Sequence, residues 1–547
     1  MKNDKNKESK ITKNTIVEDV VTKDVETGET TTENKSTDKK AKENKKYEIK
    51  IWKCILSVVF AILSVMLVYL LVWSKYIFGN VPFAQVLFHV MVPLEGTDSS
   101  IIASYFYGVA PWVALMVAAI IGTGVIYHFV KEKKFKNKIL KLVFGINKFL
   151  VRKMVPFTSF LLAIVLIVNF FGFGIHFWLI DRFDSSTLYE DYYVDAAKAN
   201  IKAPEKKKNL IFVLSESLEA SFTDDDNGGC MDRNYMPKLT ALAKENTHFS
   251  RNETLAGAVE VEGTGWTIAA MVAQMSGVPL VLPIGRNSYG KYGEFLPGIT
   301  SMGEILKKYG YNNEIIIGSK REFAGVDTFF EQHGEYEIFD YYTALEEEYV
   351  TGHNGFWGID DKDLLQIAKD EISQLAAKDE PFSVIVNTID LHTPGGYICE
   401  DCYYEYNHGY KNIIACQVRQ LTRWVEWCKT QEFYEDTVIV VAGDHLSMAP
   451  VVKNEFTPEG YDRSVYNAII NSDLEPVNAT NRLFTTMDMF PTILASLGFE
   501  IEGDRLGLGT NLYSDKKTVM EEVGKKEFME EISKNSKLYN KEILGTR

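Results

Sequence analysis

The sequence predicts an α/β protein in which three N-terminal transmembrane helices precede a domain with a mostly parallel central sheet, covered by helices on both faces. Three observations support this prediction. Apolar stretches long enough to cross a bilayer occur at residues 51–74, 107–130 and 155–180. Beyond them, short apolar runs alternate with amphipathic ones, which is typical of α/β domains. Polar side chains follow several of the short runs, as they do at the carboxyl ends of parallel strands.

Residues 1–50 form a polar segment rich in Lys, Glu, Thr, Asp and Asn, with almost no aromatic residues. Such a composition cannot bury enough apolar surface to fold, so we expect a disordered tail. The segment also lacks the short apolar core with which a secretory signal begins.

The region 51–180 is expected to cross the membrane three times, with aromatic residues near the ends of the spans. Lysines are dense before the first span and in the loop at 131–154, whereas the loop at 75–106 has hardly any basic residue. The positive-inside rule therefore places the N-terminus in the cytoplasm and everything after about residue 181 outside it. We expect a multi-pass protein of the cell membrane. The net charge of −15 argues against nucleic acid as a partner.

The outer region reads as a linker at 181–207, a catalytic-sized domain at 208–512 and a charged, weakly helical tail at 513–547. Within the domain, buried-strand patterns and helical spacing alternate repeatedly. The expected strands are 209–215, 312–319, 382–390 and 436–445, and the expected helices are 236–246, 298–311, 361–381, 417–431 and 490–498. Thr300 or Ser301 is the expected N-cap of the second of these helices, and Gly310 its end.

Of the six cysteines, Cys54 lies in the first span and five lie in the outer region. Cys399 and Cys402 have the spacing of half a zinc site, but no second C-x-x-C follows. An exported domain permits disulfides, so a disulfide within this loop is the preferred interpretation. Five cysteines leave one unpaired, and the sequence does not identify it.

Three of the expected strands end in chemically active residues. Glu216 follows the first strand, and Asp444 and His445 stand at the end of the last. The run "FSVIVNTID" ends in Asp390, and His392 comes two residues later. Two carboxylates and an imidazole suit one divalent cation, and this mixed ligation leaves Mn²⁺, Mg²⁺ and Zn²⁺ open; we put Mn²⁺ first. The sequence alone does not prove that these strand ends converge.

Thr267 stands in "VEVEGTGWTIAAMVAQMSGVPL", where two glycines give way to a small-residue helix. A threonine hydroxyl becomes a useful nucleophile when a metal or a base activates it, so Thr267 is the expected fourth ligand and the attacking group. Gly263 and Gly265 would allow a tight turn, and the N–H groups of the helix would face a phosphate. The alternative is a simple helix N-cap.

Six motifs, "NLIFVLSESLEASF", "EGTGWTIAAMVAQMSGVPL", "FLPGITSMGEIL", "FWGIDDKDLL", "TIDLHTPGGY" and "AGDHLSM", resemble the phosphoglycerol transferase and lipoteichoic acid synthase branch of the alkaline phosphatase/sulfatase superfamily. The likeness is greatest to the osmoregulated periplasmic glucan type. It implies a sulfatase-like domain in which Glu216, Thr267, Asp444 and His445 hold the metal and Thr267 becomes phosphorylated. It also implies that His392 contacts the phosphate or the glycerol of the substrate.

One departure concerns the glycerol phosphate site, where lipoteichoic acid synthases carry an aromatic–Asn–Arg set. Here "REFAGVDTFF" places Val326 at the arginine position, which favours the glucan-type relative over a polymerising synthase. Arg321, or Lys320 beside it, is the candidate substitute. His353 is a further candidate for the substrate pocket. Trp266 would either stack on the substrate or pack beneath the loop.

The resemblance implies an enzyme that takes glycerol phosphate from phosphatidylglycerol in the membrane, leaves diacylglycerol, and passes the group to a hydroxyl of an envelope glycan or glycolipid. Two enzymatic alternatives are a phosphoethanolamine transferase and a sulfatase. The sulfatase interpretation needs a C/S-x-P-x-R sequence, and "CMDR" at Cys230 lacks the proline. The third alternative is a non-catalytic envelope protein that keeps the fold.

Overall fold

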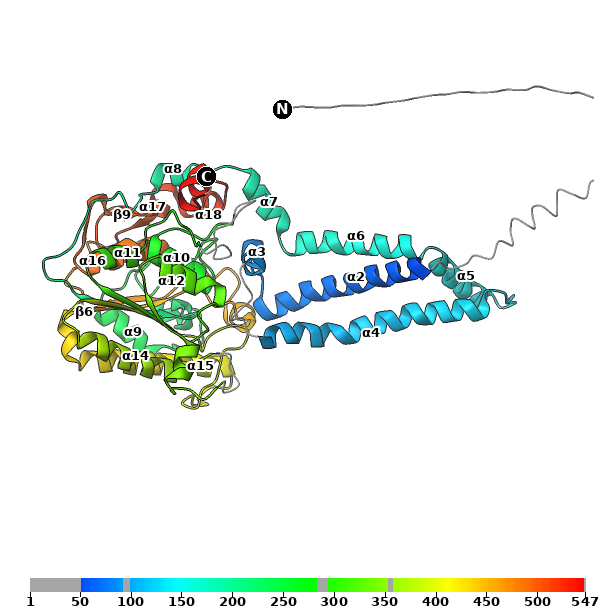
Figure 1. Ribbon diagram of the computed structural model, residues 1–547, viewed down its shortest axis with the longest axis horizontal. Coiled ribbons are helices and arrows are strands. Elements are labelled where there is room, and N and C mark those ends of the chain that lie inside the picture. Colours follow the sequence, from blue (N-terminus) through cyan, green and yellow to red (C-terminus); the bar gives the residue numbers. More distant parts are fainter. Residues whose placement is uncertain (1–50, 92–98, 283–293, 353–357, 546–547) are drawn as a thin grey trace, which may run out of the picture. The chain divides into compact units, whose positions relative to one another are not determined.

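The computed structural model describes residues 51–91, 99–282, 294–352 and 358–545 (Figure 1). The predicted tail at 1–50 and the candidate residue His353 lie outside these ranges.

Within the described residues, three helices are long and apolar enough to cross a membrane, which suggests a membrane protein: α2 (Ile51–Phe78), α4 (Ser99–Val130) and α6 (Met154–Gly172). The third is shorter than the predicted span of 155–180. Gly174 adopts a left-handed conformation with φ of 70°, which interrupts the helix, and the chain restarts as α7 (Ile175–Phe183). Two helices that the sequence did not predict lie between the spans: α3 (Phe83–Met91) and α5 (Lys138–Arg152).

A six-stranded sheet in the order β4-β3-β5-β2-β6-β7 forms the centre of the domain, and every pairing is parallel except that of β7 with β6. The predicted mostly parallel sheet is therefore confirmed. Two edge strands of three and four residues, β4 and β7, were not predicted because such short segments show no clear periodicity. The strands are β2 (Asn209–Ser215), β3 (Asn312–Ile317), β4 (Glu337–Phe339), β5 (Phe382–Asn387), β6 (Thr437–Gly443) and β7 (Asn467–Ile470).

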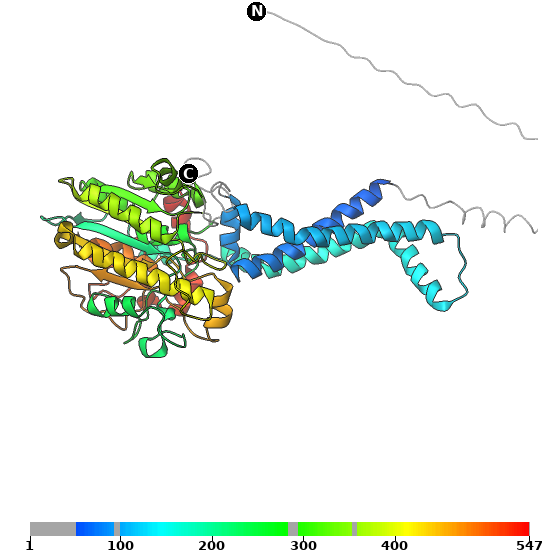
Figure 2. The ribbon, with the colours of Figure 1, turned by 90° about the horizontal axis from the view of Figure 1, so that it is seen from below.

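Helices cover both faces of the sheet, because alternate residues of each buried strand point to opposite sides. On β2, Phe212 belongs to one apolar core and Val213 to the other. Figure 1 shows helices on either side of the sheet, and Figure 2 shows the layers from another direction. One face carries α10 (Thr267–Ser276), α11 (Met302–Lys308) and α16 (Met489–Ser496), and the other carries α9 (Pro237–Glu245), α14 (Asp361–Ala376) and α15 (Gly409–Lys429).

The start of α11 resolves one choice that the sequence left open. Ser301 is the N-cap, its hydroxyl accepts from the backbone N–H of Glu304, and the Glu304 carboxylate accepts from the N–H of Ser301. This reciprocal capping box fixes the point at which the helix begins. The smaller helices α12 (Val326–Gln332) and α13 (Tyr341–Glu346) follow β3 and β4.

The segments flanking the domain pack more closely than the sequence suggested. In the expected linker at 181–207, α8 (Leu188–Tyr192) is partly buried, and β1 (Ile201–Lys202) pairs with β8 (Glu500–Ile501). In the expected tail, α17 (Val519–Val523) and α18 (Lys525–Glu531) contribute to the core. The rings of Tyr189 and Tyr539 meet at 5.2 Å. Apolar residues scattered among charges thus suffice to join both segments to the domain. A final two-stranded pair links β9 (Arg505–Leu506) with β10 (Gly509–Thr510).

Candidate functional site

Glu216 and Asp444 are brought together by the register of two neighbouring parallel strands. Ser215, the last residue of β2, lies opposite Gly443, the last residue of β6. The next residue on each strand is the acid, and both side chains are buried. Adjacent parallel strands deliver their following residues to the same edge of a sheet, so these two carboxylates are neighbours for topological reasons.

Short hydrogen bonds hold the two carboxylates in place. Ser217 has a left-handed backbone with φ of 55°, and its N–H donates to Oδ1 of Asp444 at 2.7 Å. Its hydroxyl donates to Oε1 of Glu216 at 2.6 Å. The N–H of His445 also donates to Oδ1 of Asp444, at 2.7 Å. Ser217, which follows β2, therefore links the carboxylates of Glu216 and Asp444 by hydrogen bonds.

The imidazole of His445 completes this group. Its Nδ1 lies 2.9 Å from the carbonyl oxygen of Leu446, which can only accept, so Nδ1 carries the proton. Nε2 lies 3.4 Å from Oδ2 of Asp444 and 3.7 Å from Oε1 of Glu216. Within the described residues, Oδ2 of Asp444 and Nε2 of His445 are buried without a hydrogen-bond partner. Buried polar atoms normally have partners, so two such atoms facing one point fit a divalent cation.

The electrostatics of the group also favour a bound positive charge. Burial and the neighbouring Glu216 raise the pKa of Asp444 to about 7. Burial opposes protonation of His445, but Asp444, Glu216 and Glu260 outweigh it and raise its pKa to about 9. Acids crowded into a buried space are stabilised by a proton or by a metal ion.

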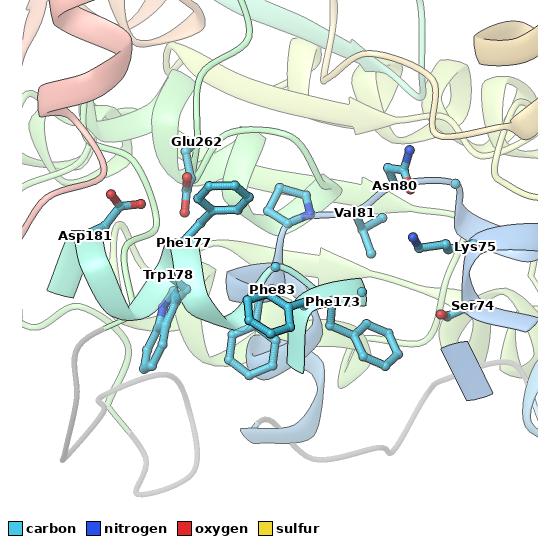
Figure 3. A pocket seen from close by; sticks show the side chains of 15 residues that line it. Ser74, Lys75, Asn80, Val81, Phe83, Phe173, Phe177, Trp178, Asp181 and Glu262 are labelled. Atoms are coloured by element: carbon cyan, nitrogen blue, oxygen red, sulfur yellow. The ribbon is translucent and has the colours of Figure 1, made fainter. Parts of the chain in front are cut away.

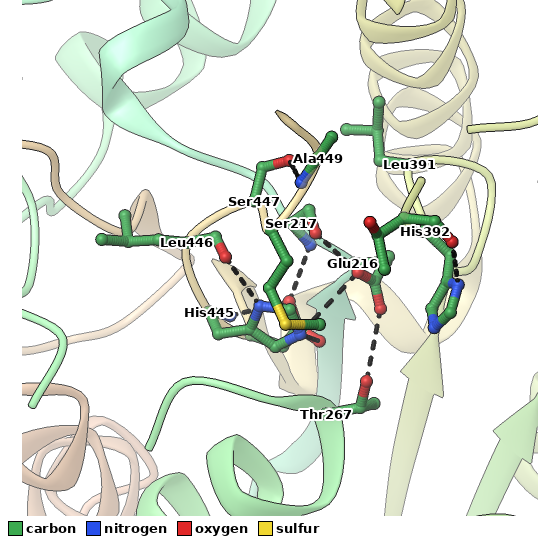
Figure 4. A network of polar contacts seen from close by, with 12 residues as sticks. Glu216, Ser217, Thr267, Leu391, His392, His445, Leu446, Ser447 and Ala449 are labelled. Carbon is green, nitrogen blue, oxygen red and sulfur yellow. Dashed lines mark hydrogen bonds and ion pairs between the residues drawn. The ribbon is translucent and has the colours of Figure 1, made fainter. Parts of the chain in front are cut away.

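Thr267 is the first residue of α10, not its N-cap, which is Trp266. Its hydroxyl donates to Oε2 of Glu216 at 3.4 Å, as Figure 4 shows. The two glycines before it allow this approach. Gly263 has φ of 81°, and a Cβ at Gly265 would lie only 2.8 Å from a carboxylate oxygen of Glu260. The Glu216 carboxylate therefore contacts both the Thr267 hydroxyl and the group of Asp444 and His445.

A small cavity of about 10 Å³ lies against this hydroxyl, with room for about one water molecule. Thr267, Glu216 and His392 line it, together with Val326. The structure therefore brings the predicted nucleophile, one predicted metal ligand and the predicted substrate histidine to one space. Val326, expected at the arginine position of lipoteichoic acid synthases, lies in the same lining.

Two candidate substrate contacts lie elsewhere. The guanidinium of Arg321 donates to Asp340 at 2.8 Å and to the hydroxyl of Thr343 at 3.1 Å, and it is not part of the cavity lining. The Arg321 guanidinium is therefore paired with the buried Asp340 carboxylate. Trp266 is 3% exposed, and its ring packs against Phe88 of α3 at 5.7 Å, so it packs beneath the loop and has no exposed face for stacking.

Sequence analysis missed several residues around the site. Glu260 accepts from the N–H of Leu446 at 2.7 Å, next to His445, and burial raises its pKa. In the sequence, Glu260 could be linked to the site only by its closeness to Thr267 along the chain. Arg463 forms an ion pair with the buried Glu219, and no spacing or motif pointed to that pair. His89, in α3, was also missed. Burial, together with the neighbouring His392, lowers its pKa to about 4.

A larger cavity of about 390 Å³ lies where the end of α2, the turn at 79–83 and the break between α6 and α7 meet the segment before Thr267. Figure 3 shows that its lining mixes aromatic and charged side chains. Phe83, Phe177 and Trp178 supply apolar surface, and Lys75 and Glu262 supply charge. The cavity is therefore amphipathic.

Comparisons with known proteins place these features in a family. A model described as Sulfatase matches residues 208–499, more than half of the chain. The chain is similar to phosphoglycerol transferase I of Xanthomonas campestris pv. campestris, at 31% identity over 318 residues that cover 57% of this chain and 43% of that protein. It is likewise similar to phosphoglycerol transferase I of Salmonella arizonae, at 32% identity over 335 residues that cover 59% and 41%. The chain thus spans about two fifths of the length of these relatives.

Solved structures with a similar fold include the lipoteichoic acid synthase LtaP of Listeria monocytogenes, with a TM-score of 0.44 and 18% identity over 58% of this chain and 79% of that one. They also include the integral membrane lipooligosaccharide phosphoethanolamine transferase A of Neisseria meningitidis, with a TM-score of 0.48 and 14% identity over 82% and 84%. The resemblance to phosphoglycerol transferases that the sequence motifs indicated is confirmed by the curated relatives. Because the sulfatase model extends from the first central strand through α16, this chain belongs to the sulfatase family.

Proposed function

We propose that this protein is a membrane-anchored, metal-dependent phosphotransferase that moves glycerol phosphate from phosphatidylglycerol to a hydroxyl of an envelope glycan or glycolipid. The observation that carries the proposal is the contact of Thr267 with Glu216 at the cavity that His392 also lines. A lone threonine at a helix start would be unremarkable. A threonine hydroxyl bonded to a buried carboxylate of a cation-binding group is suited to nucleophilic attack.

In the first half-reaction, Oγ1 of Thr267 forms a bond to the phosphorus of the donor, and the bond from phosphorus to the diacylglycerol oxygen breaks. Oε2 of Glu216 accepts the hydrogen bond of this hydroxyl, so it is the atom placed to take the proton as the attack proceeds. The departing diacylglycerol oxygen gains the proton that Glu216 took, which restores the Glu216 carboxylate. The product on the protein is a glycerol phosphate ester of Thr267.

In the second half-reaction, the acceptor hydroxyl attacks the same phosphorus, and the bond to Oγ1 of Thr267 breaks. The proton of the acceptor hydroxyl restores the threonine hydroxyl. The first N–H groups of α10 would face a phosphate held at the start of this helix, and they would stabilise its negative charge in both steps. His392, which lines the same cavity, would contact the phosphate or the glycerol.

A divalent cation fits the atoms of Glu216, Asp444 and His445, which lie within 4.8 Å of one another. When bound, it would supply positive charge for the phosphate oxygens and for the attacking oxygen. We propose Mn²⁺ first, with Mg²⁺ and Zn²⁺ as alternatives, because two carboxylates and one imidazole accept all three.

The donor is a membrane lipid, and three features support this. The described part of the chain carries three helices able to span a bilayer, and the lysine distribution supports an extracytoplasmic catalytic domain. The amphipathic cavity of about 390 Å³ offers aromatic surface that would contact the acyl chains of the lipid, and its Lys75 would pair with the phosphate. The curated relatives named phosphoglycerol transferase support the same headgroup.

The test uses the full chain in detergent with phosphatidylglycerol and Mn²⁺, followed by mass spectrometry of its peptides. We expect a glycerol phosphate adduct on Thr267, and no adduct in Thr267→Ala. The matched control is Thr264→Ala, because the Thr264 hydroxyl bonds to Val261 inside the turn and does not line the cavity. An adduct that persists in Thr267→Ala would overturn the proposal.

A parallel incubation with phosphatidylethanolamine separates the nearest alternative. An ethanolamine phosphate adduct on Thr267, formed faster than the glycerol phosphate adduct, would replace the proposed donor while keeping the nucleophile. The sulfatase alternative gains no support from the structure, because Cys230 lies outside the cavity and its thiol contacts the carbonyl oxygens of Ser221 and Phe456.

A further inference from the structure

Three cysteine side chains converge at a second place in the domain, away from the group of Glu216, Asp444 and His445. Cys399 and Cys402 lie in the loop at 388–408 that follows β5, and Cys416 lies in the first half of α15. Sγ of Cys399 is 3.6 Å from Sγ of Cys402 and 3.7 Å from Sγ of Cys416. All three are buried and unbonded, so the disulfide expected between Cys399 and Cys402 is not present.

The spacing of these sulfurs is that of ligands sharing one ion. Two Zn–S bonds of about 2.3 Å that meet at a tetrahedral angle place their sulfurs about 3.8 Å apart. Both measured separations lie close to this value, and the three sulfurs all lie within 4.8 Å of one another. A disulfide would use two sulfurs and leave the third beside it, whereas a single cation would use all three equally.

A fourth ligand atom is available from Gln420, one turn after Cys416 on α15. Its Nε2 lies 3.4 Å from Sγ of Cys399, and its Oε1 is buried without a hydrogen-bond partner among the described residues. The oxygen and nitrogen of a glutamine amide exchange places when the amide turns over. That turn would direct Oε1 toward the sulfurs and satisfy the unpartnered atom.

We propose that Cys399, Cys402 and Cys416, completed by the amide oxygen of Gln420, form a second metal site for a thiophilic divalent cation, Zn²⁺. The site is structural, because four protein atoms close its coordination. Its effect is to fasten the loop at 388–408 to α15, and this loop also carries His392. The proposal does not depend on the phosphotransferase reaction.

The experiment uses the full chain in detergent, purified without oxidant and stripped with a chelator. Asp444→Asn removes a ligand from the other group, so that metal held by sulfur is observed alone. We expect this variant to bind one equivalent of Zn²⁺ and to show the thiolate-to-metal absorption band with Cd²⁺. We also expect Zn²⁺ to protect three of the six thiols from alkylation, with peptide mapping identifying Cys399, Cys402 and Cys416.

Adding Cys416→Ser to this background should abolish the Cd²⁺ band and lower Zn²⁺ affinity at least tenfold. Cys428→Ser is the matched control, because Cys428 is buried on the same helix but outside the cluster, and the band should persist. Absence of the band in the Asp444→Asn protein would overturn the proposal, and so would a mapped disulfide between Cys399 and Cys402. The protection pattern needs no cysteine variant, so a folding failure of Cys416→Ser would leave the test intact.

Discussion

Arg463 provides the sharpest test of how the candidate site is supported. Its Nε donates to Oε2 of Glu219 at 2.9 Å, and its Nη2 donates to the carbonyl oxygen of Ser447 at 2.7 Å. Glu219 is fully buried and also accepts from the N–H of Ser447 at 2.8 Å. The pair therefore closes the turn that begins with Asp444 and His445.

Arg463→Leu would leave the Glu219 carboxylate buried without its cation. Breaking a buried ion pair in this way costs about 3–5 kcal/mol. For a domain of this size each kcal/mol lowers the unfolding midpoint by about 2–4 °C, so we expect a decrease on the order of 10 °C. The double variant Glu219→Leu, Arg463→Leu removes both charges and should recover most of this loss. Divalent metal affinity should fall in the single variant because the 444–447 turn loses its support.

The assay is thermal unfolding of the full chain in detergent, with a metal titration of each variant. Arg419→Leu is the matched control, since Arg419 pairs at 2.9 Å with the half-exposed Glu405, and such pairs contribute less than about 1 kcal/mol. If Arg463→Leu is no more destabilised than Arg419→Leu, or if the double variant is worse than the single one, the buried-pair reasoning is wrong.

Three further variants test the packing around the sheet and the site. Burial and neighbouring acids raise the pKa of Glu314 from 4.5 to about 8. The folded state therefore holds a proton that the unfolded state loses, and stability falls as pH rises from 4.5 to 8. Glu314→Gln should remove this loss, gaining up to about 1.4 kcal/mol per pH unit over the wild type in denaturant titrations, with no gain at pH 4. Val326→Arg should lower the unfolding midpoint by at least several degrees, because Val326 is 2% exposed beside a cavity of about 10 Å³; an unchanged midpoint would contradict that placement. Gly265→Ala should cost about 1–3 kcal/mol through its contact with Glu260, and Glu260→Ala should be less than additive with it in a double-variant cycle.

The central fold could be predicted because its strands are complete apolar runs buried on both faces. That pattern gave β2, β3, β5 and β6, and a parallel sheet then requires the residues after neighbouring strands to meet. The start of α11 was predicted to within one residue, because Thr300 and Ser301 can both cap a helix and Ser301 is the one that does. The third span was predicted too long because its hydropathy continues past Gly174, whereas the backbone turns there.

Long-range partners could not be predicted, because their pairing depends on tertiary packing and not on spacing. Cys416 joins Cys399 and Cys402 only once α15 packs against the loop after β5. The sequence likewise does not reveal that Asp340 lies beside Arg321 and accepts from its guanidinium. Trp266 likewise gained its partner from α3, an element that the sequence analysis did not expect.

Glu216 explains why the nucleophile and the cation ligands belong to one site. Its Oε1 accepts a hydrogen bond from the hydroxyl of Ser217 and faces Nε2 of His445. Its Oε2 accepts a hydrogen bond from the hydroxyl of Thr267. One carboxylate thus connects the edge of the sheet to the start of α10. The backbone of Glu216 is itself fixed, because its N–H donates to the hydroxyl of Thr388 after the neighbouring strand β5. The position of the Thr267 hydroxyl is therefore set by the packing of α10 on the same sheet that presents the acids. A small shift of α10 or of the strand ends would separate this hydroxyl from the Glu216 carboxylate.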